Sequence, residues 1–159
     1  MSKPAELRTV ERARPRGLLG WFFRMPVWLF RLGLGRFMPW WIMLTTVGRR
    51  SGRPRQNVVD VVKRDADAVY VIAAYGDRAD WVRNLKANPS LKAQMRGHTF
   101  GARAVFLPGD EAGGLMVDLF RSRPAYVRAV LRAIGVQAAS EEDVRNAGVN
   151  MLVVKIEKA

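Results

Sequence analysis

The sequence predicts an α+β domain in which five or six strands close into a small β-barrel and helices lie at the start, in the middle and near the end. Its 159 residues are about one domain long. Its 49% apolar and 26% charged residues are enough for a packed core under a polar surface. Short runs rich in β-branched residues and bounded by glycine and polar turns indicate the strands. A barrel is the fold that leaves so many antiparallel strands without open edges.

Residues 1–16 are polar and basic and are expected to form a flexible arm, since few apolar side chains could hold them. They do not have the pattern of a signal peptide. Residues 17–40 are expected to form an amphipathic helical segment in which arginines interrupt tryptophan and phenylalanine residues. That segment is too charged for a spanning helix. Two alternatives are open: its aromatic side chains pack on the core, or they lie in a membrane interface.

The barrel domain is expected over residues 41–159. Its strands are predicted at 42–47, 56–63, 69–74, 91–95, 99–107 and 149–157. A turn at Gly97-His98 would separate the fourth and fifth strands. Asp80 is expected to cap a short helix that Pro89 ends. A helix of roughly ten residues should begin at 108–110, and another should run from Pro124 to Gly135. Residues 140–143 resemble a capping box before a last helix.

Net charge is the strongest compositional signal. The chain carries 27 basic and 14 acidic residues, a balance of +13, and residues 1–64 contribute +11 of it. Such a charge favours an anionic partner, which could be nucleic acid, anionic lipid or a polyanionic small molecule.

Several catalytic classes are excluded by residue type. There is no cysteine and only one histidine, His98, so thiolate sites, iron–sulfur clusters and multi-histidine zinc sites cannot form, and no metal site is expected. The serine-hydrolase, phosphate-loop and Rossmann glycine motifs are also absent. Demanding chemistry would therefore have to come from a cofactor.

A turn rich in arginine is the sharpest local feature. Arg49, Arg50, Arg53 and Arg55 fall within seven residues, and Ser51 stands between two glycines of the same turn. Guanidinium groups bind phosphate and carboxylate through paired donors. The turn therefore indicates an anion site, with a solvated hairpin turn as the alternative.

Two stretches resemble the deazaflavin-dependent nitroreductase family. They are LTTVGRRSGRPR at 44–55 and WVRNLKANP at 81–89, in that order. The resemblance extends from about Pro39 to the last strand. It implies a split β-barrel that binds coenzyme F420, whose reduced form delivers a hydride to a quinone, nitroaromatic or activated alkene.

The resemblance also implies site residues. Arg50, Ser51 and Arg55 would hold the phosphate and polyglutamate tail of the cofactor, with Arg49 or Arg53 assisting. The stretch Ala73-Ala74-Tyr75-Gly76 would lie along the deazaflavin ring, Trp81 would pack near the ring, and Asn84 would fix the loop. Better-known family members carry several tyrosines in the late helix. Only Tyr126 matches here, and it is the candidate for orienting the substrate or donating a proton.

Two alternatives have less support. An FMN enzyme on the same barrel would need fewer arginines, and a non-enzymatic protein that binds nucleic acid or lipid rests on net charge alone. The leading hypothesis needs a small-molecule hydride acceptor and no nucleic acid. It also predicts a cytoplasmic protein at the inner face of the membrane, bound to anionic lipid, and allows a homodimer.

Overall fold

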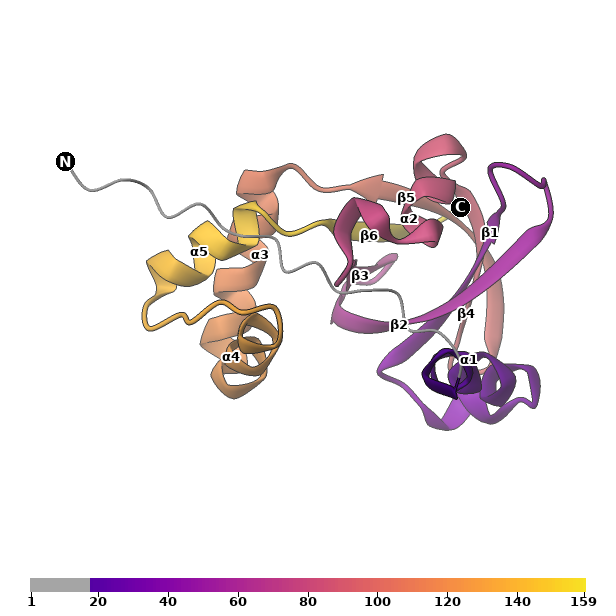
Figure 1. Cartoon of the computed structure of the whole chain (residues 1–159), viewed down its shortest axis with the longest axis horizontal. Coiled ribbons are helices and arrows are strands. Elements are labelled where there is room, and N and C mark those ends of the chain that lie inside the picture. The colour runs from indigo at the N-terminus through magenta and orange to yellow at the C-terminus, as the bar shows by residue number, and fades with distance from the viewer. Residues whose placement is uncertain (1–17) are drawn as a thin grey trace.

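The chain is described here by a computed structural model covering residues 18–159, with side chains described from Met25 onward. The predicted basic arm, residues 1–16, lies outside the described residues. Six antiparallel strands form a closed barrel in the order β1-β2-β3-β6-β5-β4 (Figure 1). The strands are β1 (Trp41–Val47), β2 (Pro54–Arg64), β3 (Ala68–Ile72), β4 (Ser90–Met95), β5 (His98–Phe106) and β6 (Val153–Lys158). The predicted fold class is confirmed.

The barrel closes because alternate side chains point inward and fill it. Ile42 and Leu44 of β1 are fully buried, and they are two residues apart, as strand geometry requires. Small residues on β4 and β5 balance these larger side chains across the barrel. The interior cluster includes Val69, Val71, Ala93, Ala102, Ala104, Val154 and Ile156.

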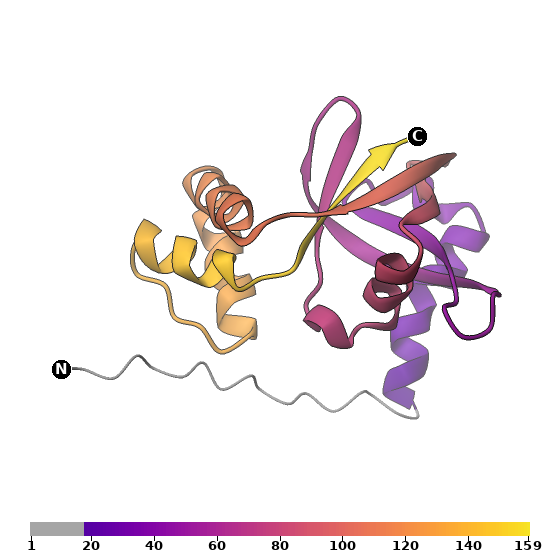
Figure 2. The same ribbon diagram turned by 90° about the horizontal axis from the view of Figure 1, so that it is seen from above.

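Three helices pack together on the outer face of the barrel, to the left in Figure 1 and again in Figure 2. They are α3 (Gly109–Ser122), α4 (Pro124–Ala133) and α5 (Glu141–Val149). Helices α3 and α5 approach closely at Gly148, where an added Cβ would stand 2.9 Å from the Cα of Gly113. Val62 of β2 and Val153 of β6 join the same buried cluster, which fixes this helical layer to the barrel.

The remaining helices lie at the other end of the molecule. They are α1 (Leu18–Arg31), the 3₁₀ turns η1 (Leu34–Phe37) and η2 (Gly76–Arg78), and α2 (Asp80–Ala87). Pro26 lies inside α1. Helix α2 covers the barrel beside the turn between β1 and β2, and its Trp81, Val82 and Leu85 are buried.

Several boundary predictions were wrong. Ala79, not Asp80, is the N-cap of α2; Asp80 is the first helical residue, and its side chain pairs with Arg49. The turn before β5 is Arg96-Gly97, so His98 begins the strand. Helix α3 has 14 residues rather than about ten. The predicted capping box at Ser140 is confirmed, and it starts a helix that runs on to Val149. The last strand therefore begins at Val153, not at Val149.

The aromatic segment has one buried and one exposed side. Phe30 is 1% exposed, and Arg31 Nε donates to Gln56 Oε1 of β2 at 2.8 Å, so α1 is fixed on the barrel. The segment's exposed large apolar side chains, which together we call the exposed aromatic face, are Met25, Trp28, Leu32, Leu34, Phe37 and Trp40. Packing on the core thus accounts for Phe30 but not for these residues. Over residues 18–159, no helix combines the length and apolarity needed to cross a bilayer.

Candidate functional site

The arginine turn joins β1 to β2 and is closed by its own backbone. Gly48 N donates to Arg53 O at 2.8 Å, and Gly52 N donates to Gly48 O at 2.7 Å. Gly52 has φ of 65°, a left-handed conformation that side chains other than glycine rarely adopt. The sequence thus folds a tight turn whose arginine side chains must project away from the backbone.

Three guanidinium groups of this turn are exposed. Among the residues that the structure describes, the side chains of Arg50, Arg53 and Arg55 make no hydrogen bond or ion pair. Ser51 Oγ accepts from Arg53 N at 3.3 Å, which leaves its hydroxyl proton free to donate. The turn therefore gathers three exposed cations and a hydroxyl donor, a set suited to phosphate and carboxylate oxygens.

A buried network holds the turn from below. Asn84 of α2 is 3% exposed, and its Oδ1 accepts from Arg49 N at 3.2 Å and from Arg49 Nη1 at 3.1 Å. Its Nδ2 donates to the buried Thr46 Oγ1 at 3.1 Å. Arg49 Nη2 also pairs with Asp80 Oδ1 at 3.2 Å. Unlike its three neighbours in the turn, Arg49 is thus committed to internal contacts.

The predicted ring-binding stretch follows β3. Ala73 is buried, and its amide donates to Leu152 O at 2.9 Å, whereas Ala74 and Tyr75 are exposed. The stretch leads through η2 into α2, so the Arg49–Asp80 pair ties it to the arginine turn. Trp81 is 7% exposed and belongs to the same buried cluster as Ala73.

Tyr126 is not brought to the arginine turn. It lies on α4, and α4 and the β1–β2 turn occupy opposite ends of the molecule in both views (Figures 1 and 2). The Arg123 guanidinium carbon is 5.1 Å from the centre of its ring. Burial raises the pKa of Tyr126, the Asp60 carboxylate adds to that rise, and Arg123 opposes it. The phenol therefore keeps its proton at neutral pH.

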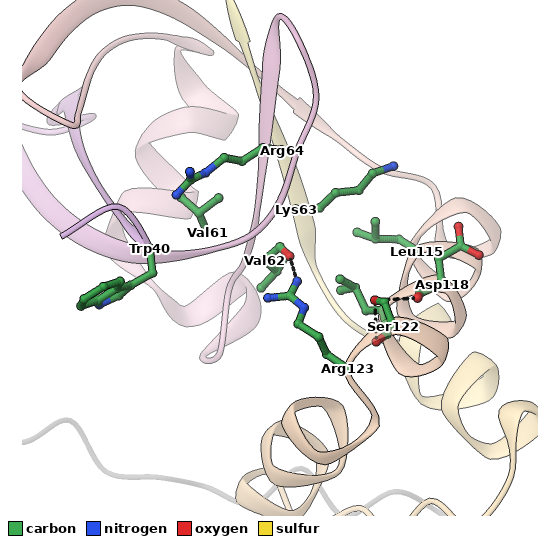
Figure 3. A pocket seen from close by; sticks show the side chains of 10 residues that line it. Trp40, Val61, Val62, Lys63, Arg64, Leu115, Asp118, Ser122 and Arg123 are labelled. Carbon is green, nitrogen blue, oxygen red and sulfur yellow. Dashed lines mark hydrogen bonds between the residues drawn. The ribbon is translucent and has the colours of Figure 1, made fainter.

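A groove runs between β2 and α3 (Figure 3). Its volume is about 430 Å³, within the range of small-molecule sites. Apolar and charged side chains both line it; among the charged ones, Arg123 donates to Val62 O and lies against the Tyr126 ring. The lining residues are Trp40, Val61, Val62, Lys63, Arg64, Leu115, Asp118, Leu119, Ser122 and Arg123.

Sequence reasoning missed part of both regions. Thr46 stands in the motif LTTVGRRSGRPR, but its role appears only when Asn84 is seen to reach it across 38 residues. Asp80 was assigned to a helix cap instead of to Arg49. Arg123 and Trp40 belong to no motif, and only the fold brings them to one groove.

Comparisons with known proteins show the family from the sequence and the fold from solved structures. The sequence profile of a family described as F420H(2)-dependent quinone reductase matches residues 30–139. An F420-H2 dependent reductase, FDR-A, is 20% identical with a TM-score of 0.51 over 74% of this chain and 94% of its own. The heme storage protein HutZ from Vibrio cholerae is 14% identical, with a TM-score of 0.52 over 81% and 88%. Atu2129 from Agrobacterium tumefaciens, of unknown function, is 13% identical, with a TM-score of 0.54 over 92% and 57%.

Proposed function

Because this chain belongs to the F420H2-dependent quinone reductase family, it is an F420-dependent oxidoreductase, and we propose that its arginine turn binds the anionic end of the cofactor. The observation that carries this proposal is the set of three exposed guanidinium groups on one glycine-closed turn, none of which has a partner within residues 25–159. When bound, reduced F420 supplies a hydride to a small-molecule acceptor.

The donor set fits the cofactor. A phosphate and several carboxylates offer many acceptor oxygens, and Arg50, Arg53 and Arg55 each present several donors in a planar fork. Ser51 adds a hydroxyl donor. We assign Arg49 a different task from the one its sequence suggested: through Asn84 and Asp80 it positions the turn, and the other three arginines make the contacts with the anion.

The ring-binding proposal rests on exposure and side-chain size. Ala74 is exposed and has the smallest side chain other than glycine, so a flat ring can approach the backbone there, whereas the buried Ala73 anchors the stretch in the core. Tyr75 is 39% exposed and could cover one face of such a ring. Trp81 lies in the buried layer below, where it supports the stretch.

Tyr126 remains the proposed group for orienting or protonating the acceptor. Its raised pKa keeps the phenol protonated, and Arg123 fixes its ring. Anaerobic oxidation of reduced F420 by a quinone tests both the function and this role. We expect turnover in the wild-type protein, and we expect Tyr126→Phe to lower turnover by about 10-fold or more with cofactor affinity unchanged. Full turnover in Tyr126→Phe would make water the proton source, and no oxidation with any quinone would contradict the function itself.

We propose a second property, attachment to the surface of an anionic membrane. The exposed aromatic face carries Trp28, Phe37 and Trp40, and Arg31 and Arg36 lie on the same segment. Tryptophan and phenylalanine partition into the headgroup region, and each basic residue near it contributes about 1 kcal/mol with anionic lipid. An enzyme placed there would meet quinones where they are most concentrated, on the cytoplasmic side. A homodimer that covers the same face is the competing proposal.

Co-sedimentation with vesicles separates these alternatives. The full chain should pellet with anionic vesicles and be partly released by salt, since screening weakens the charge contribution. Replacing Trp28 and Phe37 with alanine should abolish most of the binding. Both side chains are exposed, at 55% and 63%, so the fold should be unaffected. If the full chain ignores anionic vesicles at low salt and elutes as a dimer, the aromatic face is a subunit interface.

A further inference from the structure

We propose that the groove between β2 and α3 binds the apolar side chain of the quinone acceptor, which enters past Trp40. This inference rests on the proposed function, because it takes a quinone as the acceptor. It assigns the specificity for that acceptor to residues outside the two family motifs.

The walls of the groove suit an apolar chain. Val62 of β2 and Leu115 and Leu119 of α3 are 3%, 6% and 5% exposed, so they offer a small apolar floor. Val61 packs towards the barrel interior, and its amide donates to Trp40 O at 2.8 Å, which holds Trp40 at the edge of the groove. Figure 3 shows Trp40 on one side of the groove and Leu115 on the other. A chain bound between this floor and the exposed Trp40 would lose contact with water on those two sides.

The groove has a polar limit. A second hollow of about 380 Å³ continues from it and shares Lys63, Leu115 and Asp118. The continuation is lined by charged side chains, among them Glu111, Lys155 and Glu157. Burying a methylene chain against charged groups gains little binding free energy. The part of the groove that favours an apolar chain therefore ends near Lys63 and Asp118. The groove should therefore accept the first carbons of a chain and exclude the rest.

The entrance is continuous with the exposed aromatic face. Trp40 is 55% exposed, is one member of that face, and also lines the groove. A quinone leaving a lipid surface at this face would meet apolar contacts from the bilayer into the groove. This continuity selects a quinone carrying a side chain over a small soluble quinone.

Arg123 connects the groove to Tyr126. Its guanidinium lines the groove, donates to Val62 O and lies against the Tyr126 ring. A quinone whose chain lies in the groove would thus have two groups beside its ring. The Arg123 guanidinium can donate to a carbonyl oxygen, and the Tyr126 phenol is the proposed proton donor. Arg123 is the residue between α3 and α4, and the geometry also gives it a role in positioning the acceptor.

Equilibrium dialysis of the full-length apo-protein tests the proposal without turnover. The probes are naphthoquinones with no side chain, a short isoprenoid chain and a longer one. Affinity should rise up to about fourfold for each methylene that is buried, and then level off. Ser122→Trp, at an exposed groove position, should weaken binding of the chain-bearing quinone about tenfold or more and leave the chain-free quinone unchanged. Asp118→Leu should move the plateau to a longer chain.

Matched controls isolate the groove. Arg132→Trp also introduces an indole, at an exposed position of α4 that does not line the groove, and it should not change binding. Trp40→Ala should weaken binding of the chain-bearing quinone in the absence of vesicles, whereas Trp28→Ala, at an equally exposed tryptophan, should not. Asp118→Leu is expected to increase the affinity for the longer chain. It therefore tests the groove even if Ser122→Trp weakens binding only by destabilising the fold.

Three results would overturn the proposal: affinity independent of chain length, equal effects of Ser122→Trp and Arg132→Trp, or displacement of the quinone by a fatty acid of the same chain length at the same concentration. The last would make the groove a general lipid-chain site. Reduction of the chain-free quinone by reduced F420 is measured separately. If that reaction proceeds while the groove tests fail, the proposed function stands and only this inference falls.

Discussion

Replacing Arg50 or Arg55 with alanine should weaken F420 binding by about 1.5–3 kcal/mol for each arginine, the scale of a hydrogen bond to a charged group. Each side chain is exposed and makes no ion pair within the described residues, so its removal should not disturb the fold. The expected change is about 10- to 150-fold in Kd, measured by titrating apo-protein with F420 and following fluorescence. The loss should shrink at high salt, because exposed charges are screened.

Arg132→Ala is the matched control for the arginine variants. It removes one positive charge from an exposed position on α4, at the other end of the molecule from the turn. A small, salt-sensitive change in this variant would measure the general effect of net charge. If Arg50→Ala and Arg55→Ala match it, the turn contributes only to solubility and the tail of the cofactor binds elsewhere.

Asn84→Ala should have the largest effect on stability. The substitution removes the side-chain oxygen that accepts from Arg49 N and Arg49 Nη1. It also removes the amide that donates to Thr46 Oγ1, and Thr46 is only 1% exposed, so water cannot easily replace that donor. Buried polar groups that lose their partners destabilise a fold, and we expect about 2–4 kcal/mol here. Thermal or urea unfolding measures the change, and cofactor affinity measured well below the transition should also fall.

Two further variants at and near this position sharpen the test. Asn84→Asp keeps an oxygen that can accept from Arg49 but loses the amide that donates to Thr46. If the main role of Asn84 is to position the turn, Asn84→Asp should lower cofactor affinity less than Asn84→Ala does. Asn88→Ala removes an exposed asparagine at the end of the same helix, whose Oδ1 accepts from Ser90 N at 3.1 Å. It should cost less than about 1 kcal/mol. Equal losses in Asn84→Ala and Asn88→Ala would contradict the network.

The strands and the barrel could be predicted because their signals are local. The short apolar and β-branched runs at 42–47 and 69–72 are a property of a few neighbours, and antiparallel closure follows once six such runs exist. The capping box at Ser140 was predictable for the same reason. The start of the last strand was not, since α5 is prolonged by its packing against α3 at Gly148, a contact between distant segments.

In the candidate site too, features set by neighbouring residues could be predicted and features set by distant residues could not. Arg50, Ser51 and Arg55 lie within one turn, so the sequence alone indicated an anion site there. The internal role of Arg49 depends on Asp80 and Asn84, which lie more than 30 residues away in the chain. Nothing in the sequence near Arg49 separates it from its neighbours in the turn. The groove depends on longer-range packing still, because Arg123 reaches Val62 from a different layer of the fold.

The most direct measurement compares the affinity of the wild-type protein for intact F420 and for its deazaflavin chromophore without phosphate and polyglutamate. If the arginine turn binds the anionic end, the intact cofactor should bind far more tightly. Replacing Arg50, Arg53 and Arg55 together with alanine should then remove most of that difference and leave the affinity for the bare chromophore unchanged. Equal affinities for the two compounds in the wild-type protein, or a difference that survives in the triple variant, would contradict the account.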